Sequence, residues 1–248
     1  MANGLSSGAF MFSIRELVRH YLRKRRYKRI FQKYKEFTMV PFENFVHNLE
    51  LCERFKNIEG SVVECGVWRG GMSASMAEVL GTSRRYYLFD SFEGLPKAKE
   101  IDGREALQWQ KDKSAPNYFD NCKAEIEFAQ KAMSLSKADE VEIVKGWFNE
   151  TLPSARIGEP IAILRLDGDW YGSTMDCMEN LYPKVAPGGL VLMDDYYFWD
   201  GFAKAIHDYS SKYKLPIRIN QWKNSNVYYI IKKSVNVAGI VDEDRKSD

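Results

Sequence analysis

The chain has 248 residues, 45% of them hydrophobic, and a formal net charge of +2. This length suits one α/β domain with a well-buried core and is short for two independent domains. The four cysteines show no metal-binding or redox spacing. No secretion signal is evident, and no apolar run approaches the ~18 residues of a membrane span. The sequence therefore argues against an exported or membrane-integral protein and predicts a cytoplasmic one.

The first predicted element is a basic helical segment. Ten Lys or Arg residues and one acid lie between Arg15 and Lys35, so the rest of the chain is net acidic. Apolar residues recur at steps of three and four from Ile14 to Tyr34, which predicts one or two amphipathic helices. Such helices can pack on the domain or on a second subunit, lie on an anionic membrane surface or carrier, or bind nucleic acid.

We therefore expect residues 1–36 to form a basic helical appendage. Its expected partners are a second copy of the chain, in a homo-oligomer, or the inner face of a membrane through peripheral contact. We expect no nucleic-acid partner.

From residue 60 onward, predicted strands and helices alternate. The predicted strands are Ser61–Cys65, Tyr86–Asp90, Val141–Lys145, Ile161–Leu166 and Leu190–Met193, and helices are predicted near Met72–Leu80, Tyr118–Ala132, Thr174–Leu181 and Phe202–Tyr213. This alternation is typical of right-handed βαβ units and a parallel sheet covered by helices on both faces. A short polar link joins two final strands, Ile217–Asn220 and Asn226–Ile231, so the last strand should run antiparallel. The prediction is a doubly wound α/β domain of seven strands over residues 37–233, followed by a polar tail over residues 234–248.

One long connection interrupts the alternation. Ser91–Asn117 carries mixed charge, two glycines, two prolines and little periodicity. Long connections inside compact domains are commonly lids or binding loops. We expect either such a loop or a disordered surface insertion.

Two features at strand ends indicate an adenosine-bearing cofactor. Glu64 and Gly66 open a glycine turn after the first strand, where backbone can approach a ligand closely. The turn matches neither the dinucleotide fingerprint nor a phosphate-binding loop. Asp90 ends the second strand, where a carboxylate reaches ribose hydroxyls in doubly wound nucleotide sites, although it could instead cap a helix.

Four acids close two later strands. Asp167 and Asp169 follow the fourth strand, and Asp194 and Asp195 follow the fifth, so their side chains should converge at one edge of the sheet. Carboxylates there can share a hard divalent cation while a remaining one accepts a proton; the alternative is a solvated acidic turn. Aromatic residues beside these acids suit the C–H face of a sugar, and we expect two or three of them to touch an acceptor: Trp170, Tyr171, Tyr196, Tyr197 and Trp199.

Several stretches together resemble the macrocin O-methyltransferase family. They span residues 62–71, 88–96, 164–169 and 181–196, and the resemblance runs from about Thr38 to Lys232. It implies a class I methyltransferase (Rossmann-like) sheet and methyl transfer to sugar hydroxyls that depends on S-adenosylmethionine and a divalent metal. It also implies cofactor-binding positions at Thr38, Met39, Glu64, Gly66, Asp90, Ser91, Trp147 and Phe148, metal ligands at Asp167, Asp194 and Asp195, and a general base at Asp169.

The sequence therefore predicts an O-methyltransferase that uses S-adenosylmethionine and Mg²⁺. Its expected acceptor is a saccharide-containing molecule: a glycoside, a polysaccharide precursor or a glycosylated natural product. A catechol-type enzyme would use a similar metal and acid arrangement on a planar diol. A binding protein with this fold and no turnover is the other alternative, but it would have no physical reason to keep unneutralised carboxylates together.

Overall fold

The protein is built on one seven-stranded sheet. The computed structural model describes residues 7–233, and its strands are β1 (Ser61–Cys65), β2 (Arg85–Asp90), β3 (Glu140–Lys145), β4 (Ile161–Leu166), β5 (Val185–Met193), β6 (Ile219–Gln221) and β7 (Tyr228–Ile231). They are ordered β3-β2-β1-β4-β5-β7-β6. The first five strands pair in parallel, and β7 is antiparallel to both of its neighbours. The predicted doubly wound sheet with an antiparallel last strand is confirmed.

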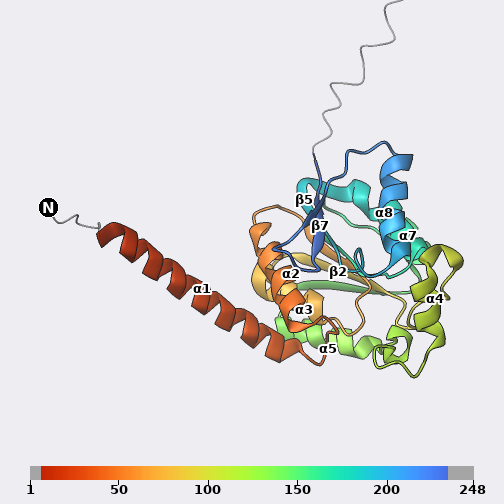
Figure 1. Cartoon of the computed structure of the whole chain (residues 1–248), viewed down its shortest axis with the longest axis horizontal. Coiled ribbons are helices and arrows are strands. Elements are labelled where there is room, and N and C mark those ends of the chain that lie inside the picture. The colour runs from red at the N-terminus through yellow and green to blue at the C-terminus, as the bar shows by residue number, and fades with distance from the viewer. Residues whose placement is uncertain (1–6, 234–248) are drawn as a thin grey trace, which may run out of the picture.

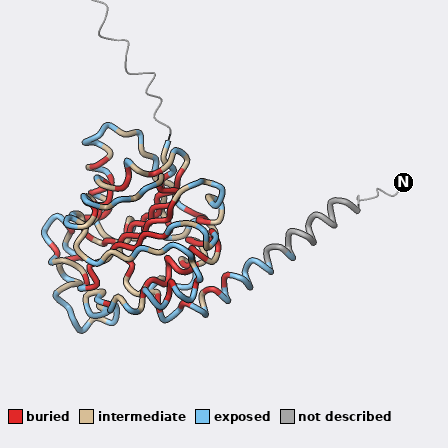
Figure 2. Tube along the Cα trace, turned by 180° about the vertical axis from the view of Figure 1, so that it is seen from behind, coloured by how far each residue is buried: buried red, intermediate tan, exposed pale blue. Residues whose placement is uncertain are grey.

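Helices cover both faces of the sheet (Figure 1). One face carries the end of α1 (Ser7–Tyr34), α2 (Phe42–Arg54), α3 (Gly71–Leu80) and α5 (Ile126–Ser136), and the other carries α6 (Phe148–Thr151), α7 (Tyr171–Leu181) and α8 (Asp200–Lys212). Side chains alternate along a strand, so neighbouring strand residues enter the cores on opposite faces of the sheet. Val62 packs in the core on the α2 and α3 side, and Val63 packs in the core on the α7 and α8 side. The two cores make the sheet the most deeply buried part of the molecule (Figure 2).

The basic segment forms a single helix, α1, whose two ends have different surroundings. Near its C-terminal end, Tyr27, Ile30 and Tyr34 are buried in the core. Its N-terminal half extends away from the sheet (Figure 1), and Val18 and Tyr21 are exposed there. None of the described helices is long and apolar enough to cross a membrane. The division of the chain at residue 36 stays a prediction, and residues 1–6 and the tail from 234 lie outside the described part.

The connection Ser91–Asn117 is folded, so the expectation of a disordered insertion is wrong. It contains a short 3₁₀ turn, η1 (Glu100–Asp102), and the helix α4 (Arg104–Lys111). Ala106 on α4 is buried, and the Asp102 carboxylate accepts a hydrogen bond from Tyr171 N at the start of α7 (2.8 Å). These contacts hold the segment against the carboxyl ends of the strands.

Two predicted elements begin at clearly different residues, and the helix α2 was not predicted. α5 begins at Ile126 because the preceding turn η2 (Phe119–Cys122) has positive φ at all four residues, which a right-handed helix cannot contain. β5 begins at Val185, five residues early, across an irregular pairing with β4 that absorbs Pro187 and its glycines. The helix α2 carries no signal that we recognised in the sequence.

Candidate active site

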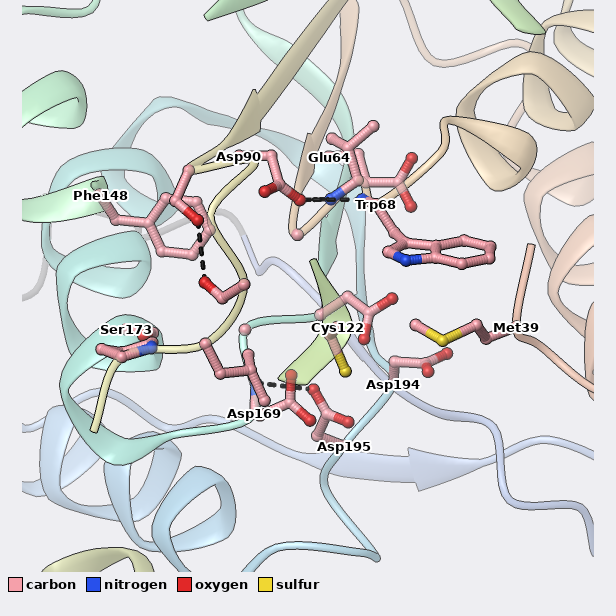
Figure 3. Close-up of a pocket in the computed structure, with 18 of the residues that line it drawn as sticks. Met39, Glu64, Trp68, Asp90, Cys122, Phe148, Asp169, Ser173, Asp194 and Asp195 are labelled. Atoms are coloured by element: carbon pink, nitrogen blue, oxygen red, sulfur yellow. Dashed lines mark hydrogen bonds between the residues drawn. The ribbon is translucent and has the colours of Figure 1, made fainter. Parts of the chain in front are cut away.

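One cavity of about 660 Å³ lies at the carboxyl ends of the parallel strands. This is where open α/β sheets bind ligands. Every site residue predicted from the sequence lines it: Thr38, Met39, Glu64, Gly66, Asp90, Ser91, Trp147, Phe148, Asp167, Asp169, Asp194 and Asp195. Figure 3 shows Asp90 on one side of the cavity and Asp169 with Asp195 on the other.

The glycine turn after β1 lets two strand ends approach each other. Gly66 has a φ of +87°, and a Cβ there would lie 1.6 Å from the carbonyl oxygen of Asp167. Its N–H donates to Phe89 O (2.9 Å), and Asp167 N donates to Cys65 O (2.8 Å). Only glycine fits this contact, which fixes the position of Asp167 beside the end of β1.

Asp90 joins the end of β2 to the same turn. Its carboxylate accepts hydrogen bonds from the backbone N–H groups of Val67 (2.7 Å), Trp68 (2.8 Å) and Phe92 (2.6 Å). Burial raises the pKa of Asp90 above its usual range, although these bonds oppose the change. A carboxylate has about four acceptor sites, so one remains for a ligand hydroxyl.

The segment after α1 forms another wall of the cavity. Gly71 N donates to Phe37 O (2.8 Å), and a Cβ on Gly71 would lie 2.5 Å from that oxygen. This close approach to the start of α3 brings Thr38 and Met39 to the cavity. Phe148, at the start of α6, lies across the cavity from Met39 (Figure 3).

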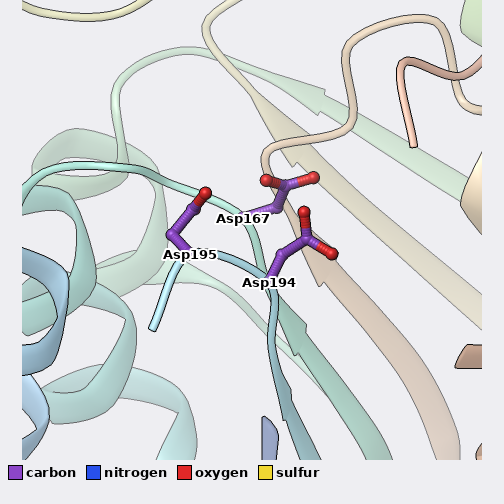
Figure 4. A group of neighbouring side chains, drawn as sticks. All are labelled: Asp167, Asp194 and Asp195. Atoms are coloured by element: carbon purple, nitrogen blue, oxygen red, sulfur yellow. The ribbon is translucent and has the colours of Figure 1, made fainter. Parts of the chain in front are cut away.

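Three aspartates at the ends of β4 and β5 form a compact group. Asp167, Asp194 and Asp195 each offer a carboxylate oxygen within 4.8 Å of the others (Figure 4). Asp194 N donates to Leu166 O (3.0 Å), which keeps the two strand ends in register. These three side chains therefore converge at one edge of the sheet, as the sequence predicts.

A buried arginine that the sequence reading missed lies beneath this group. Arg165 on β4 is 1% exposed, and its guanidinium donates to Glu64, Asp167 and Asp194, each at 2.6 Å. Glu64 also accepts a hydrogen bond from Ser73 Oγ, so side chains already engage both of its oxygens. The signal was a charged residue inside an otherwise apolar strand, which burial permits only when partners are close.

Asp169 is held by an indole. Trp199 Nε1 donates to its Oδ1 (2.8 Å), and Asp169 N donates to Asp195 Oδ2 (3.0 Å). Burial raises the pKa of Asp169 to about 7; the hydrogen bond from Trp199 opposes this rise, and the negative charges of nearby carboxylates, Asp194 among them, add to it. A carboxyl group with such a pKa can accept a proton near neutral pH.

A model of the macrocin O-methyltransferase family matches residues 28–230. The chain belongs to this family. A Streptomyces olivaceus relative, 8-demethyl-8-(2,3-dimethoxy-alpha-L-rhamnosyl)-tetracenomycin-C 4'-O-methyltransferase, is 35% identical over 203 residues, which cover 77% of this chain and 74% of the relative. Mycinamicin III 3''-O-methyltransferase of Micromonospora griseorubida is 30% identical over 199 residues, 77% of this chain and 76% of the relative. The solved structure of the O-methyltransferase NovP has a TM-score of 0.63 and 30% identity, covering 80% of this chain and 83% of that one.

Membership makes this protein an S-adenosylmethionine-dependent O-methyltransferase with a class I methyltransferase fold. The calicheamicin methyltransferase CalS11 has the same fold at 19% identity, with a TM-score of 0.55. The resemblance seen in the motifs is confirmed, and the alternative of a non-catalytic binding protein is not supported.

The charges of the methyltransferase cavity fit cationic ligands. Seven acidic residues line it, against two basic ones, Lys99 and Arg165. Burial raises the pKa of Asp167 and of Asp195 well above the usual range, and the charges of neighbouring acids add to the effect. Carboxylates in this state are stabilised in their charged form by a nearby cation. The donor set is all oxygen, which is the chemistry that hard divalent ions prefer.

The aromatic lining of the methyltransferase differs from the expected one. Of the five aromatics predicted beside the acids, only Trp199 lines the cavity. Trp170 is buried with its ring centroid 5.2 Å from that of Trp199, and the Tyr171 hydroxyl donates to Asp208 (3.0 Å). Other segments supply the remaining rings: Phe37, Trp68, Trp109, Phe119, Trp147 and Phe148. Trp109 comes from α4, with its ring centroid 6.0 Å from that of Trp199, a pairing across 90 residues that no local pattern indicates.

Proposed function

We propose that this enzyme methylates a hydroxyl group of a sugar carried on a larger molecule, with Mg²⁺ as its metal. The observation that carries the proposal is the group of three aspartate oxygens within 4.8 Å beside Asp169, in one cavity of a family member. The name of the tetracenomycin relative includes a rhamnosyl group, which supports a glycoside acceptor. Indole rings such as those of Trp109 and Trp199 suit the C–H face of a sugar.

Asp167, Asp194 and Asp195 would hold the metal ion. A divalent ion there would supply Lewis acidity towards an alcohol oxygen, whose own pKa is far above 7. Arg165 binds one oxygen of Asp167 and one of Asp194, so each retains a second oxygen for a ligand. The ion would also neutralise carboxylates that Arg165 alone leaves in excess.

Asp169 would act as the general base. Its Oδ1 is occupied by the Trp199 indole, so Oδ2 is the atom that would take the proton from the acceptor hydroxyl. Trp199 also fixes the rotation of this carboxylate. A base held in this way needs little reorganisation when the proton moves.

The opposite end of the cavity would bind the cofactor. S-adenosylmethionine supplies an activated methyl group whose sulfonium charge is lost on transfer. Asp90, which has acceptor capacity left, would bind the ribose hydroxyls, and Trp147 and Phe148 would flank the adenine. Thr38 and Met39, with Glu64, Gly66 and Ser91, would line the methionine end and exclude water from the transferring group.

The setting of the enzyme is also a proposal. We infer a cytoplasmic enzyme, because the four cysteines are free thiols and none has a metal-binding or redox spacing. A homo-oligomer and a peripheral membrane contact remain the expected associations. The exposed part of α1 is the surface available for either.

Labelled S-adenosylmethionine and paired acceptors test the proposed substrate class. We expect methyl transfer to glycosides or nucleotide sugars in the presence of Mg²⁺, and much slower transfer to catechol. Each acceptor should be paired with the analogue that lacks the candidate hydroxyl, which should not react. Methylation of catechol alone would refute the sugar acceptor and favour the catechol-type alternative.

A further inference from the structure

The helix α1 has two faces with different chemistry. At 3.6 residues per turn, Tyr27, Ile30 and Tyr34 share the face that is buried against the domain. The opposite side carries a group that we call the outward face: Val18, Tyr21, Leu22, Arg25 and Arg29. All five are exposed, and the three apolar ones are 51–59% exposed. The outward face therefore combines exposed apolar side chains with arginines one turn further along.

The basic residues of α1 divide in the same way. Those that reach the domain are paired: Arg26 with Glu53 (2.6 Å), Lys33 with Glu78, and Arg23 with Glu50 (3.8 Å). Within residues 7–233, no ion pair involves Arg25 or Arg29.

The guanidinium of Arg25 instead lies over the ring of Tyr21, 5.7 Å from its centroid. Packing on the domain thus accounts for the basic residues on the inner side of α1. It leaves Arg25 and Arg29 on the outward face without an acidic partner in the described structure.

We propose that the outward face of α1 binds an anionic membrane surface. Val18, Tyr21 and Leu22 would enter the boundary between headgroups and acyl chains, while Arg25 and Arg29 meet lipid phosphates. An amphipathic helix with Lys and Arg beside its apolar residues is the usual form of such a contact. Positive charge and apolar area act together here, since either alone gives weak binding.

Charge disfavours the pairing of two α1 helices. The segment from Arg15 to Lys35 has ten basic residues and one acid, so two outward faces brought together would repel. Anionic lipid offers the complementary charge over the whole length of the exposed face. The N-terminal half of α1 extends clear of the domain, which leaves this face accessible to a flat surface (Figure 1).

The position of α1 gives the contact a consequence for the enzyme. The helix leads directly into residues 37–41, which line the cavity. The bound helix would therefore keep the cavity close to the membrane, where an acceptor carried on a lipid would be concentrated. This inference concerns α1 alone and does not depend on which hydroxyl is methylated.

Vesicle flotation with the full chain tests the proposal. The vesicles are phosphatidylcholine with or without phosphatidylserine, at low and high salt. The unchanged protein should float with phosphatidylserine vesicles and be released by salt. The double variant Arg25→Glu, Arg29→Glu should lose at least about tenfold in partitioning, and so should the triple variant Val18→Ser, Tyr21→Ser, Leu22→Ser.

The matched control is Lys113→Glu with Lys137→Glu, two exposed lysines outside α1, which should float like the unchanged protein. All variants should keep the melting temperature and S-adenosylmethionine affinity of the parent, since they leave the buried face of α1 intact. No flotation of the unchanged protein, or equal flotation of the charge-reversed one, would overturn the proposal. A vesicle-free dimer that the triple variant converts to monomer, without any flotation, would assign the face to a second copy instead.

Discussion

Arg165 binds carboxylates from three neighbouring strands, β1, β4 and β5. Each of Asp167 and Asp194 gives it one oxygen, so the arginine sets how these side chains rotate before any ligand arrives. Groups that orient metal ligands in this way typically contribute about 10–100-fold to metal affinity.

The substitution Arg165→Lys tests this role, because it keeps the charge and loses the forked geometry. We expect Mn²⁺ affinity to fall about 10–100-fold in a calorimetric titration. S-adenosylmethionine affinity should fall much less, because Asp90 is held by backbone donors and Arg165 reaches the proposed cofactor end only through its hydrogen bond to Glu64. Unchanged Mn²⁺ affinity would show that Arg165 does not position the ligands, whereas absent Mn²⁺ binding in the parent would refute the metal site itself.

Asp169 gives the second prediction at this scale. Replacing it by Asn removes the proton acceptor but keeps an oxygen for the Trp199 indole. Turnover should fall roughly 10²–10⁴-fold while Mn²⁺ affinity stays nearly the same. Single-turnover rates and a Mn²⁺ titration measure the two effects. The exposed Asp112→Asn is the control and should behave like the parent; a full rate for Asp169→Asn would exclude it as the base.

The candidate site was predictable from sequence wherever its residues end strands. Asp90, Asp167 and Asp194 follow apolar strands, and parallel strands bring their carboxyl ends together. Trp199 was among the aromatics expected at the acceptor, but its hydrogen bond to Asp169 was not predicted, and neither was Trp109. These contacts depend on how distant segments fold back over the cavity, which no local sequence pattern indicates.

At the level of elements, the apolar patterns of strands and helices predicted the sheet well. Residues with unusual backbone conformations caused the errors in where elements begin. The helix α5 starts late because the four residues Phe119–Cys122 have positive φ. This segment contains no glycine, so the sequence does not indicate that conformation. The helix α1 was predicted as an appendage, yet Tyr27 and Tyr34 are buried in the core and donate to Glu53 and Glu78. Amphipathic periodicity alone cannot tell which face of a helix meets the domain.

The contact of α1 with Glu53 predicts a pH effect on stability. Burial favours the protonated form of Glu53, but hydrogen bonds from Tyr27 and Arg26 outweigh it and hold the pKa of Glu53 below 4.5. A depressed pKa contributes stability above pH 4.5 that is lost as the pH falls through the folded-state value. Glu53→Gln should therefore be less stable than the parent at pH 7, by about 0.5–1 kcal/mol for a partly exposed pair.

Thermal unfolding of both proteins between pH 7 and pH 3 measures this difference. It should shrink towards acid, because protonated Glu53 resembles Gln. Lys204→Gln, at an exposed ion pair on α8, is the control for charge loss elsewhere. If the difference in stability between the parent and Glu53→Gln does not change with pH, the charge of Glu53 does not stabilise the contact of α1 with the domain.

At the scale of the whole molecule, the cavity at the carboxyl ends of the strands has a proposed cofactor end and a proposed metal end, and different residues hold each of them in place. Asp90 is fixed by the turns after β1 and β2, whereas Asp194 is fixed by Arg165 and the end of β4. In the described part of the chain, the two ends share the close packing at Gly66 and the side chain of Glu64, which lines the cavity and binds Arg165. Cofactor binding and metal binding should therefore be lost independently.

Two substitutions test this separation. Asp90→Ala should weaken S-adenosylmethionine binding by about 1.5–3 kcal/mol, through the lost charge-assisted acceptor, and leave Mn²⁺ affinity nearly unchanged. Asp194→Asn should do the reverse. Because Asp90 also anchors three backbone N–H groups, the melting temperature must be measured alongside, and Asp90→Asn, which keeps one acceptor oxygen, separates ligand binding from folding. Excess chelator should abolish methyl transfer by the parent while calorimetry still detects S-adenosylmethionine binding. If one substitution reduces both affinities equally in a folded protein, the cavity is a single coupled site and the separate roles of its two ends are wrong.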